Sequence, residues 1–154
     1  MDVADLFGHI PFANHLGIEV TEAVDGTAAG YVEFQDEHSS NPAGRIAHGG
    51  VTYSLADTVG GAAVVSVNED VTPTVDMRMD YLAPATTDLY AEAELVRNGG
   101  SVAVAAIEVY ALEGAPEAAA EGSVDTARAD HVATARGVYK TGGDTSETPW
   151  NTSG

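Results

Sequence analysis

The spacing of apolar residues predicts a short helical region, one long helix and six strands. Residues 3–16 have helical spacing interrupted by Gly8 and Pro11, so we expect one or two short helices packed on the edge of a domain. The first two strands meet at Asp25-Gly26, a dipeptide typical of hairpin turns. The predicted strands, which end at turn residues, are 17–24, 28–34, 74–82, 89–96, 102–112 and 132–139.

A polar, turn-rich loop at 35–47 leads into the long helix, which we place at 49–67. This helix is apolar on nearly every side, as is typical of a helix buried in a core. It carries one carboxylate, Asp57, and several glycines, so we interpret it as a core helix and not as a membrane span. A sheet with one such helix must cover it, which predicts the α+β class with an antiparallel sheet wrapped around the helix.

The length of 154 residues is typical of one domain, which we place at 1–140. Residues 113–130 are rich in Ala, Glu and Gly, and we expect a long, mobile excursion there. Residues 141–154 are rich in Gly, Thr, Ser and Asp, which predicts a disordered tail. Trp150 in this tail either docks on a partner subunit or is exposed and idle.

The formal net charge is -18, from 24 acidic against 6 basic residues, and Lys140 is the sole lysine. This charge would repel the phosphates of nucleic acid and an anionic membrane, so we expect neither as a partner. The acidic residues are scattered and form no block, which favours a salt-adapted surface over an acidic patch for a basic partner. The pattern resembles proteins of extreme halophiles.

The chain has no cysteine, which excludes disulfides, thiol nucleophiles and cysteine-ligated metals. Its histidines at 9, 15, 38 and 131 lack metal-ligand spacing, so we expect no metal and no cofactor. The N-terminus has no basic start followed by an apolar run, so we expect no signal peptide and a cytoplasmic protein.

One carboxylate in a buried helix costs free energy unless it is paired, and catalysis is one reason to keep it there. Asp57 would act as a general base on water or attack a carbonyl directly, or would be a structural residue bonding the hydroxyl of Tyr53 or Thr58. Gly49 and Gly50 open the helix with free N–H groups, which can hold a carbonyl oxygen and its developing oxyanion. The alternative is that these glycines relieve crowding where the helix packs on the sheet.

The chain contains His48-Gly49-Gly50 followed by Leu55-Ala56-Asp57. With these motifs it resembles the hotdog-fold acyl-CoA thioesterases, in the branch of the phenylacetate-pathway and the mammalian medium- and long-chain acyl-CoA thioesterases. The similarity covers about residues 16–141. His-Gly-Gly followed by Leu-Ala-Asp at this spacing is the specific signal, and the chain departs from the family in one extra residue before His48 and in its longer 113–130 segment. The matching residues are Asn41, Gly44, His48-Gly49-Gly50, Ser54 to Thr58, Thr74 to Pro84 and Ala135-Arg136-Gly137.

The resemblance implies further roles around Asp57. Thr74 would hold the attacking water or orient Asp57, Asn41 would position water or the substrate carbonyl, and His48 would lie near the thioester sulfur or orient the loop. Each has an ordinary alternative: a strand threonine, a loop asparagine before Pro42, and a neutral histidine capping a turn. Three arginines could meet coenzyme A phosphates or form surface ion pairs, and we assign none of them: Arg78, Arg97 and Arg136.

Asp57 lies eight residues beyond Gly49, which is roughly 12 Å along a helix axis. One thioester cannot readily contact both within a single chain, so we expect a site shared between subunits of a dimer or a dimer of dimers, as the resemblance also implies. The predicted function is hydrolysis of an acyl- or aryl-CoA. The alternatives are a hotdog-fold dehydratase or hydratase on hydroxyacyl or enoyl thioesters, and a non-catalytic acyl-CoA binding module.

Overall fold

A computed structural model describes residues 2–142. Most of the predicted tail, Trp150 included, lies outside these residues. Within them no helix is both long and apolar enough to span a bilayer. The elements in chain order are α1 (Val3–Phe7), α2 (Pro11–Leu16), β1 (Ile18–Val24), β2 (Thr27–Val32), η1 (Asp36–His38), α3 (Gly49–Asn68), β3 (Thr74–Tyr81), β4 (Leu89–Asn98), β5 (Val102–Ala111), α4 (Ala115–Glu121), η2 (Thr126–Arg128) and β6 (Asp130–Lys140).

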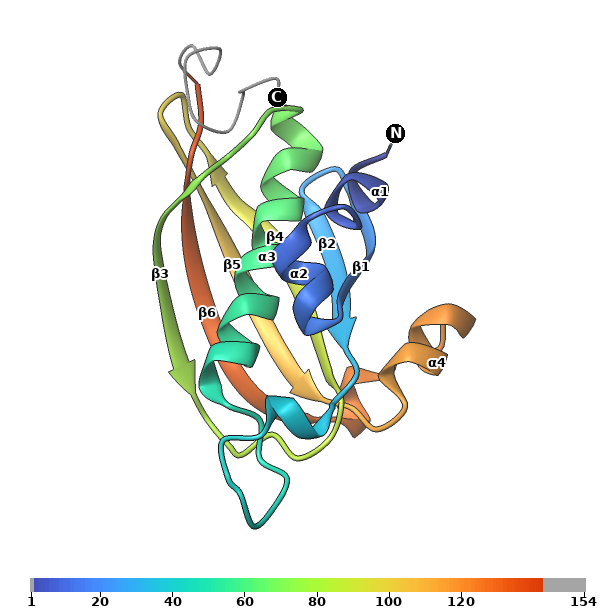
Figure 1. The fold of residues 1–154 in the computed structure, drawn as a ribbon. Coiled ribbons are helices and arrows are strands. Elements are labelled where there is room, and N and C mark those ends of the chain that lie inside the picture. Colours follow the sequence, from blue (N-terminus) through green and yellow to red (C-terminus); the bar gives the residue numbers. More distant parts are fainter. Residues whose placement is uncertain (1, 143–154) are drawn as a thin grey trace.

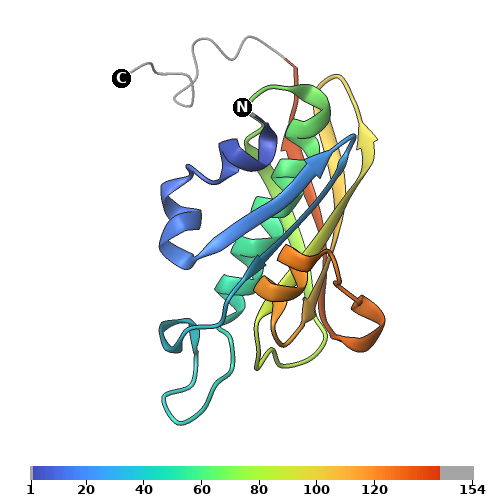
Figure 2. The same cartoon turned by 90° about the vertical axis from the view of Figure 1, so that its right-hand side faces the viewer.

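The six strands form one antiparallel sheet in the order β1-β2-β4-β5-β6-β3. The sheet curls around α3, and α1 and α2 lie beside α3 near the edge formed by β1 (Figure 1). Figure 2 shows the β1–β2 hairpin crossing over α3. The predicted α+β class, with an antiparallel sheet wrapped around one long helix, is confirmed.

The core lies between α3 and the concave face of the sheet. Leu55, Val59 and Val64 of α3 are fully buried, and Ile107 and Val109 of β5 are fully buried opposite them. Fully burying a side chain of this size stabilises the fold by about 1.5–3 kcal/mol. The helix therefore stays central because nearly all of its faces are apolar.

The N-terminal region, where one or two short helices were predicted, contains two. The Asp2 carboxylate caps α1 by accepting from the Asp5 N–H at 2.8 Å. Pro11 begins α2, where a missing N–H costs nothing, and Gly17 ends it with a φ of 77° that favours glycine. These local signals explain why the interruption at Gly8 and Pro11 separates two helices.

The 113–130 segment, predicted as a long, mobile excursion, contains two helical elements that were not predicted, α4 and η2. Gly114 and Gly122 flank α4 with φ values of 71° and 65°, so both glycines mark the ends of a helix. Ala115 is fully buried beside Ala29 and Tyr90 on the outer face of the sheet. The segment therefore covers part of that face.

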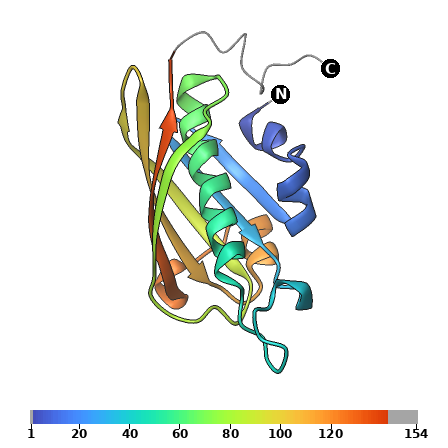
Figure 3. The ribbon, with the colours of Figure 1, turned by 60° about the vertical axis from the view of Figure 1, so that its left-hand side comes forward.

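β3 is an edge strand, with β6 on one side and no neighbour on the other within residues 2–142. Its predicted alternation places Met77 in the core at 8% exposure, but Val75 and Tyr81 are 59% and 54% exposed. A register shift near Thr74 interrupts the pairing with β6. The edge position, which local sequence does not encode, accounts for these exposed apolar side chains. Figure 3 shows β3 running beside α3.

Candidate active site

Asp57 and Thr74 are joined by a hydrogen bond. The Thr74 hydroxyl donates to Oδ1 of Asp57 at 2.7 Å, which links the third turn of α3 to the start of β3. The two hydroxyls considered as structural partners bond elsewhere: Tyr53 donates to the Met77 carbonyl at 3.3 Å and Thr58 to the Ser54 carbonyl at 2.7 Å. The bond from Thr74 orients the Asp57 carboxylate. Because Asp57 is half-buried, this carboxylate is not sealed in the core.

Tyr139 of β6 supports the same turn of the helix. Its hydroxyl donates to the backbone carbonyl of Asp57 at 3.1 Å, and the residue is 1% exposed. Burial, and secondarily the Asp57 charge, raises the pKa of Tyr139 far above its ordinary value, so the phenol stays a hydrogen-bond donor. The contact spans 82 residues of sequence, and no local signal could have predicted it.

Gly60 makes this approach of Tyr139 possible. A Cβ atom at residue 60 would lie 2.3 Å from Oη of Tyr139 and 3.0 Å from Cδ1 of Ile107. At Gly61, in contrast, a Cβ atom would meet ordinary contacts of 3.6 Å or more. Of these two adjacent glycines, only Gly60 is therefore required by packing.

His48 is the N-cap of α3. Its Nδ1 accepts from the Gly50 N–H at 2.8 Å, and its carbonyl accepts from the Val51 N–H at 2.9 Å. Because Nδ1 accepts this bond, Nε2 is the ring nitrogen that is left to donate. The Gly49 N–H has no hydrogen-bond partner within residues 2–142. It is therefore an amide of the first turn that remains available to a ligand.

A cavity of about 430 Å³ adjoins Gly49. Tyr81 forms part of its wall and donates from Oη to the Gly49 carbonyl at 2.7 Å. A Cβ atom at Gly49 would lie 3.1 Å from the Tyr81 ring. The other lining residues are Ile46, Ala47, Thr52, Leu82, Ala83, Pro84, Ala85 and Val132.

Asp57 and Thr74 line a different cavity, of about 710 Å³. It lies between α3, the α1–α2 region and the segment that joins α3 to β3. The two cavities share no lining residue. The single chain therefore brings Thr74 to Asp57 but leaves Gly49 in a separate cavity, about two helical turns away.

Asn41 lines neither the cavity beside Gly49 nor the cavity beside Asp57 and Thr74. Its Oδ1 accepts from the Ala43 N–H at 3.0 Å, and its carbonyl accepts from the Ser39 hydroxyl at 3.0 Å. This is the turn geometry that an asparagine before proline commonly adopts. Arg45 in the same loop donates to the Phe34 carbonyl at 3.0 Å. Within one chain, the structure therefore places Asn41 in an exposed turn outside both cavities.

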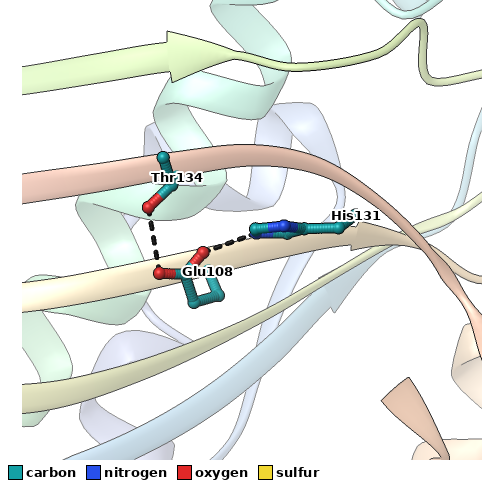
Figure 4. Close-up of polar contacts among 3 residues, drawn as sticks. All are labelled: Glu108, His131 and Thr134. Atoms are coloured by element: carbon teal, nitrogen blue, oxygen red, sulfur yellow. Dashed lines mark hydrogen bonds and ion pairs between the residues drawn. The ribbon is translucent and has the colours of Figure 1, made fainter. Parts of the chain in front are cut away.

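A second polar cluster lies on the outer face of the sheet (Figure 4). Glu108 accepts from Thr134 at 2.9 Å and contacts Nε2 of His131 at 2.5 Å, which uses both of its carboxylate oxygens. The neighbouring Ile107 and Val109 face the core, so Glu108 faces away from α3. This cluster links β5 to β6 and is separate from Asp57. Residues 2–142 contain no group of three or more His, Asp or Glu side chains that could hold a metal ion.

Arg78 and Arg136 lie opposite each other on paired strands of the same outer face. Arg78 forms an ion pair with Asp80 at 3.2 Å, and both side chains are exposed. Such a pair contributes little to stability. Of the two alternatives for Arg78, a contact with coenzyme A phosphates or a surface ion pair, the structure contains the ion pair.

The chain is similar to known proteins in both sequence and structure. The family model of the thioesterase superfamily matches residues 44–118, a range that includes Gly49, Asp57 and Thr74 but not Asn41. A Halobacterium salinarum protein named as an esterase is 38% identical over 100 residues, which cover 61% of this chain and 66% of that protein. The medium/long-chain acyl-CoA thioesterase YigI of Escherichia coli is 31% identical over 118 residues, which cover 66% of this chain and 76% of that protein.

A solved structure is similar over nearly its whole length. A mutant of the phenylacetic acid degradation protein PaaI from Thermus thermophilus superposes with a TM-score of 0.68 at 25% identity, covering 86% of this chain and 99% of that one. The structural likeness therefore extends beyond the residues that the family model matches.

Proposed function

The chain belongs to the thioesterase superfamily and is a hotdog-fold thioester hydrolase, and from this premise we propose that it hydrolyses an acyl- or aryl-CoA at a site shared between two subunits. The observation that carries the proposal is the Asp57–Thr74 hydrogen bond at the wall of a cavity, with an unpaired amide at Gly49 on the same helix. The acyl-CoA specificity named for the Escherichia coli relative supports the substrate class.

In the proposed reaction, the Gly49 N–H and the positive end of the α3 dipole bind the thioester carbonyl oxygen. Asp57 either removes a proton from water, which then adds to the carbonyl carbon, or attacks that carbon itself. The tetrahedral oxyanion collapses, the C–S bond breaks, and the coenzyme A thiolate leaves and takes up a proton. Addition of water gives the free acid directly, and Asp57 passes its proton to the thiolate. Attack by Asp57 itself gives a mixed anhydride, which a water molecule then hydrolyses to the free acid and the Asp57 carboxylate. Thr74 positions Asp57 by donating to Oδ1.

The shared site follows from the separation of the two groups. Gly49 and Asp57 are about 12 Å apart along α3, too far for one carbonyl to meet both. β3 offers a place for the second subunit, because it is an open edge with exposed Val75 and Tyr81. We place the dimer contact along this edge. Assembly of dimers into a tetramer, and the cytoplasmic location, remain predictions.

His48 acts in this proposal through the helix start and not through the thioester sulfur. Its Nδ1 holds the Gly50 N–H, which leaves the Gly49 N–H free. Asn41 contributes to the shared site only if its loop lies against the partner's Asp57, since it contacts neither group in its own chain. We therefore keep Asp57, Gly49 and Thr74 as the central residues.

The test begins with Asp57→Asn, which keeps the side-chain shape and removes the charge. Asp76→Asn on the exposed face of β3 is the matched control. We expect Asp57→Asn to abolish thiol release from acyl-CoA in folded protein and Asp76→Asn to leave it intact. Release of free coenzyme A without an enoyl product would separate hydrolysis from dehydration or hydration. Equal turnover by folded Asp57→Asn would refute the proposal, and tight binding without turnover by the parent protein would favour a binding module.

Mixing two inactive variants tests whether the site is shared. Asp57→Asn subunits are refolded together with Gly49→Pro subunits, which lack the amide hydrogen. In a shared site, each mixed dimer has one intact and one doubly altered site, so random pairing restores about one quarter of the parent activity. Failure of the mixture to regain activity, with mixed dimers demonstrated by mass, would place both groups in one subunit.

A further inference from the structure

The cavity beside Asp57 is larger than hydrolysis of a thioester bond alone requires. Its volume of about 710 Å³ is within the range of sites that enclose a small organic ligand. One wall is a stripe of α3 that contains Asp57, Gly61 and Val65. Asp57 and Val65 are eight residues apart, so this wall extends about 12 Å from the carboxylate.

The wall opposite α3 comes from the N-terminal helices, which lie beside α3 in Figure 3. Phe7, Ile10 and Pro11 give it an apolar lining. Two large apolar side chains at the same cavity are open to solvent: Leu6 is 49% exposed and Phe12 is 60% exposed. Exposed apolar side chains that converge on a cavity are typical of a binding site for an apolar group.

Glycine at position 61 leaves this cavity open, although packing does not require a glycine there. A Cβ atom at residue 61 would lie 3.6 Å from the Tyr139 ring and 3.8 Å from the Phe7 ring, which are ordinary contacts. Alanine would fit there and would stabilise the helix. The missing side chain therefore keeps space beside Phe7 that a larger residue would fill.

The far end of the cavity is acidic. Glu69, the C-cap residue of α3, lines the cavity on the side of Val65 and Val71. A negatively charged group placed there would be repelled. An uncharged apolar group can lie against Val65 and Val71, whereas the phosphates of coenzyme A cannot lie near Glu69.

We propose that the acyl group of the substrate occupies this cavity, with its carbonyl at Asp57 and its apolar body extending past Gly61 toward Val65. Gly61 sets the depth that is available, and Phe12 covers the outer side. The substrate class is an uncharged acyl or aryl group longer than acetyl. This inference rests on the proposed thioesterase function and adds to it where the acyl group binds and which residues select it.

A series of acyl-CoA substrates from acetyl to dodecanoyl tests the inference by release of free thiol. In the parent protein, kcat/KM should rise by up to about fourfold per methylene until the cavity is full, because each buried methylene contributes about 0.8 kcal/mol. Gly61→Leu should stop this rise at a shorter chain, with Gly61→Ala intermediate. Phe12→Ala should flatten the rise. A substrate with a terminal carboxylate should be turned over at least tenfold more slowly than the uncharged chain of equal length.

Ile46→Ala is the control, because Ile46 lines the other cavity and should affect all chain lengths equally. Thiol release with an unchanged chain-length profile in folded Gly61→Leu and Phe12→Ala would overturn the inference while the proposed function stands. No thiol release from any acyl-CoA would overturn the proposed function itself. If Gly61→Leu dissociates the oligomer, a partner subunit occupies the cavity and the inference is wrong. If it does not fold, the profile of Phe12→Ala decides.

Discussion

The amide of Gly49 offers the sharpest test of the proposed chemistry. Proline at this position would remove the unpaired N–H of Gly49 at the start of α3. Gly49 is the first residue of the helix, where proline is well tolerated, and His48 before it has φ -57° and ψ 135°, the extended backbone that a residue before proline prefers. The Gly50 and Val51 amides keep their bonds to His48. Gly49→Pro should therefore fold and lose only this donor.

The size of the effect follows from the role of the donor. Removing one hydrogen bond to an oxyanion lowers kcat by about 10²–10³-fold, or roughly 2.7–4 kcal/mol of transition-state stabilisation. Gly49→Ala is the matched control, because it keeps the N–H but places a Cβ atom at the same point, 3.1 Å from the Tyr81 ring. Both variants must move Tyr81 by a similar amount. Their ratio of kcat therefore reports the amide alone.

Steady-state thiol release gives kcat and KM, and thermal unfolding verifies that both variants are folded. We expect Gly49→Pro to lose at least 100-fold in kcat relative to Gly49→Ala, with a smaller change in KM, since an oxyanion forms only during reaction. A Gly49→Pro enzyme within threefold of Gly49→Ala would show that this amide does not bind the developing charge.

Three further outcomes are expected. Gly60→Ala should lower the free energy of unfolding by about 1–3 kcal/mol, because its Cβ atom would lie 2.3 Å from Oη of Tyr139, whereas Gly61→Ala should raise it by up to about 1 kcal/mol; urea unfolding that ranks them the other way would contradict the packing described. Burial raises the pKa of Tyr139, and that of Tyr90 to about 12, above the ordinary 10.0. The unfolded chain therefore loses these protons first, so stability should fall as pH rises above about 10. Tyr139→Phe should reduce this loss of stability. If the free energy of unfolding of the variant falls with pH as steeply as that of the parent, Tyr139 does not cause the loss. Finally, the net charge of -18 predicts greater stability and activity in multi-molar salt, where the Debye length is below about 3 Å. Equal values in dilute buffer would argue against a salt-adapted surface.

Local signals account for the elements that were predicted well. Asp25-Gly26 marks the hairpin, and the long helix begins at Gly49 and continues to Asn68, one residue beyond the predicted end. α4 was not predicted, because Gly114 and Gly122 were counted only as part of a glycine-rich composition, which indicated a mobile segment. As helix-flanking residues with positive φ, they instead delimit a short helix. The same residues thus support opposite interpretations until their positions relative to the alanines are considered.

The candidate site was predictable in part. The apolar pattern of the helix singles out Asp57, and the start of the helix singles out Gly49, but neither pattern alone chooses between a catalytic and a structural role. Thr74 required the family resemblance, because a threonine at a strand start has no distinctive local pattern. The Tyr139 contact depends on how β6 passes α3, which only the folded chain defines. The Asn41 turn is local, but its distance from Asp57 is set by the whole loop.

The acidic rows on the outer face of the sheet limit how dimers can assemble further. Glu92 and Glu94 of β4 project from that face, and Glu92 lies directly across from Glu108. Stacking two sheets back to back would remove these carboxylates from water and set like charges against one another, a large electrostatic penalty. α4 also obstructs the β2 side. Any tetramer is therefore expected to join through the helical side of its dimers, which would bring the N-terminal helices of separate dimers into contact.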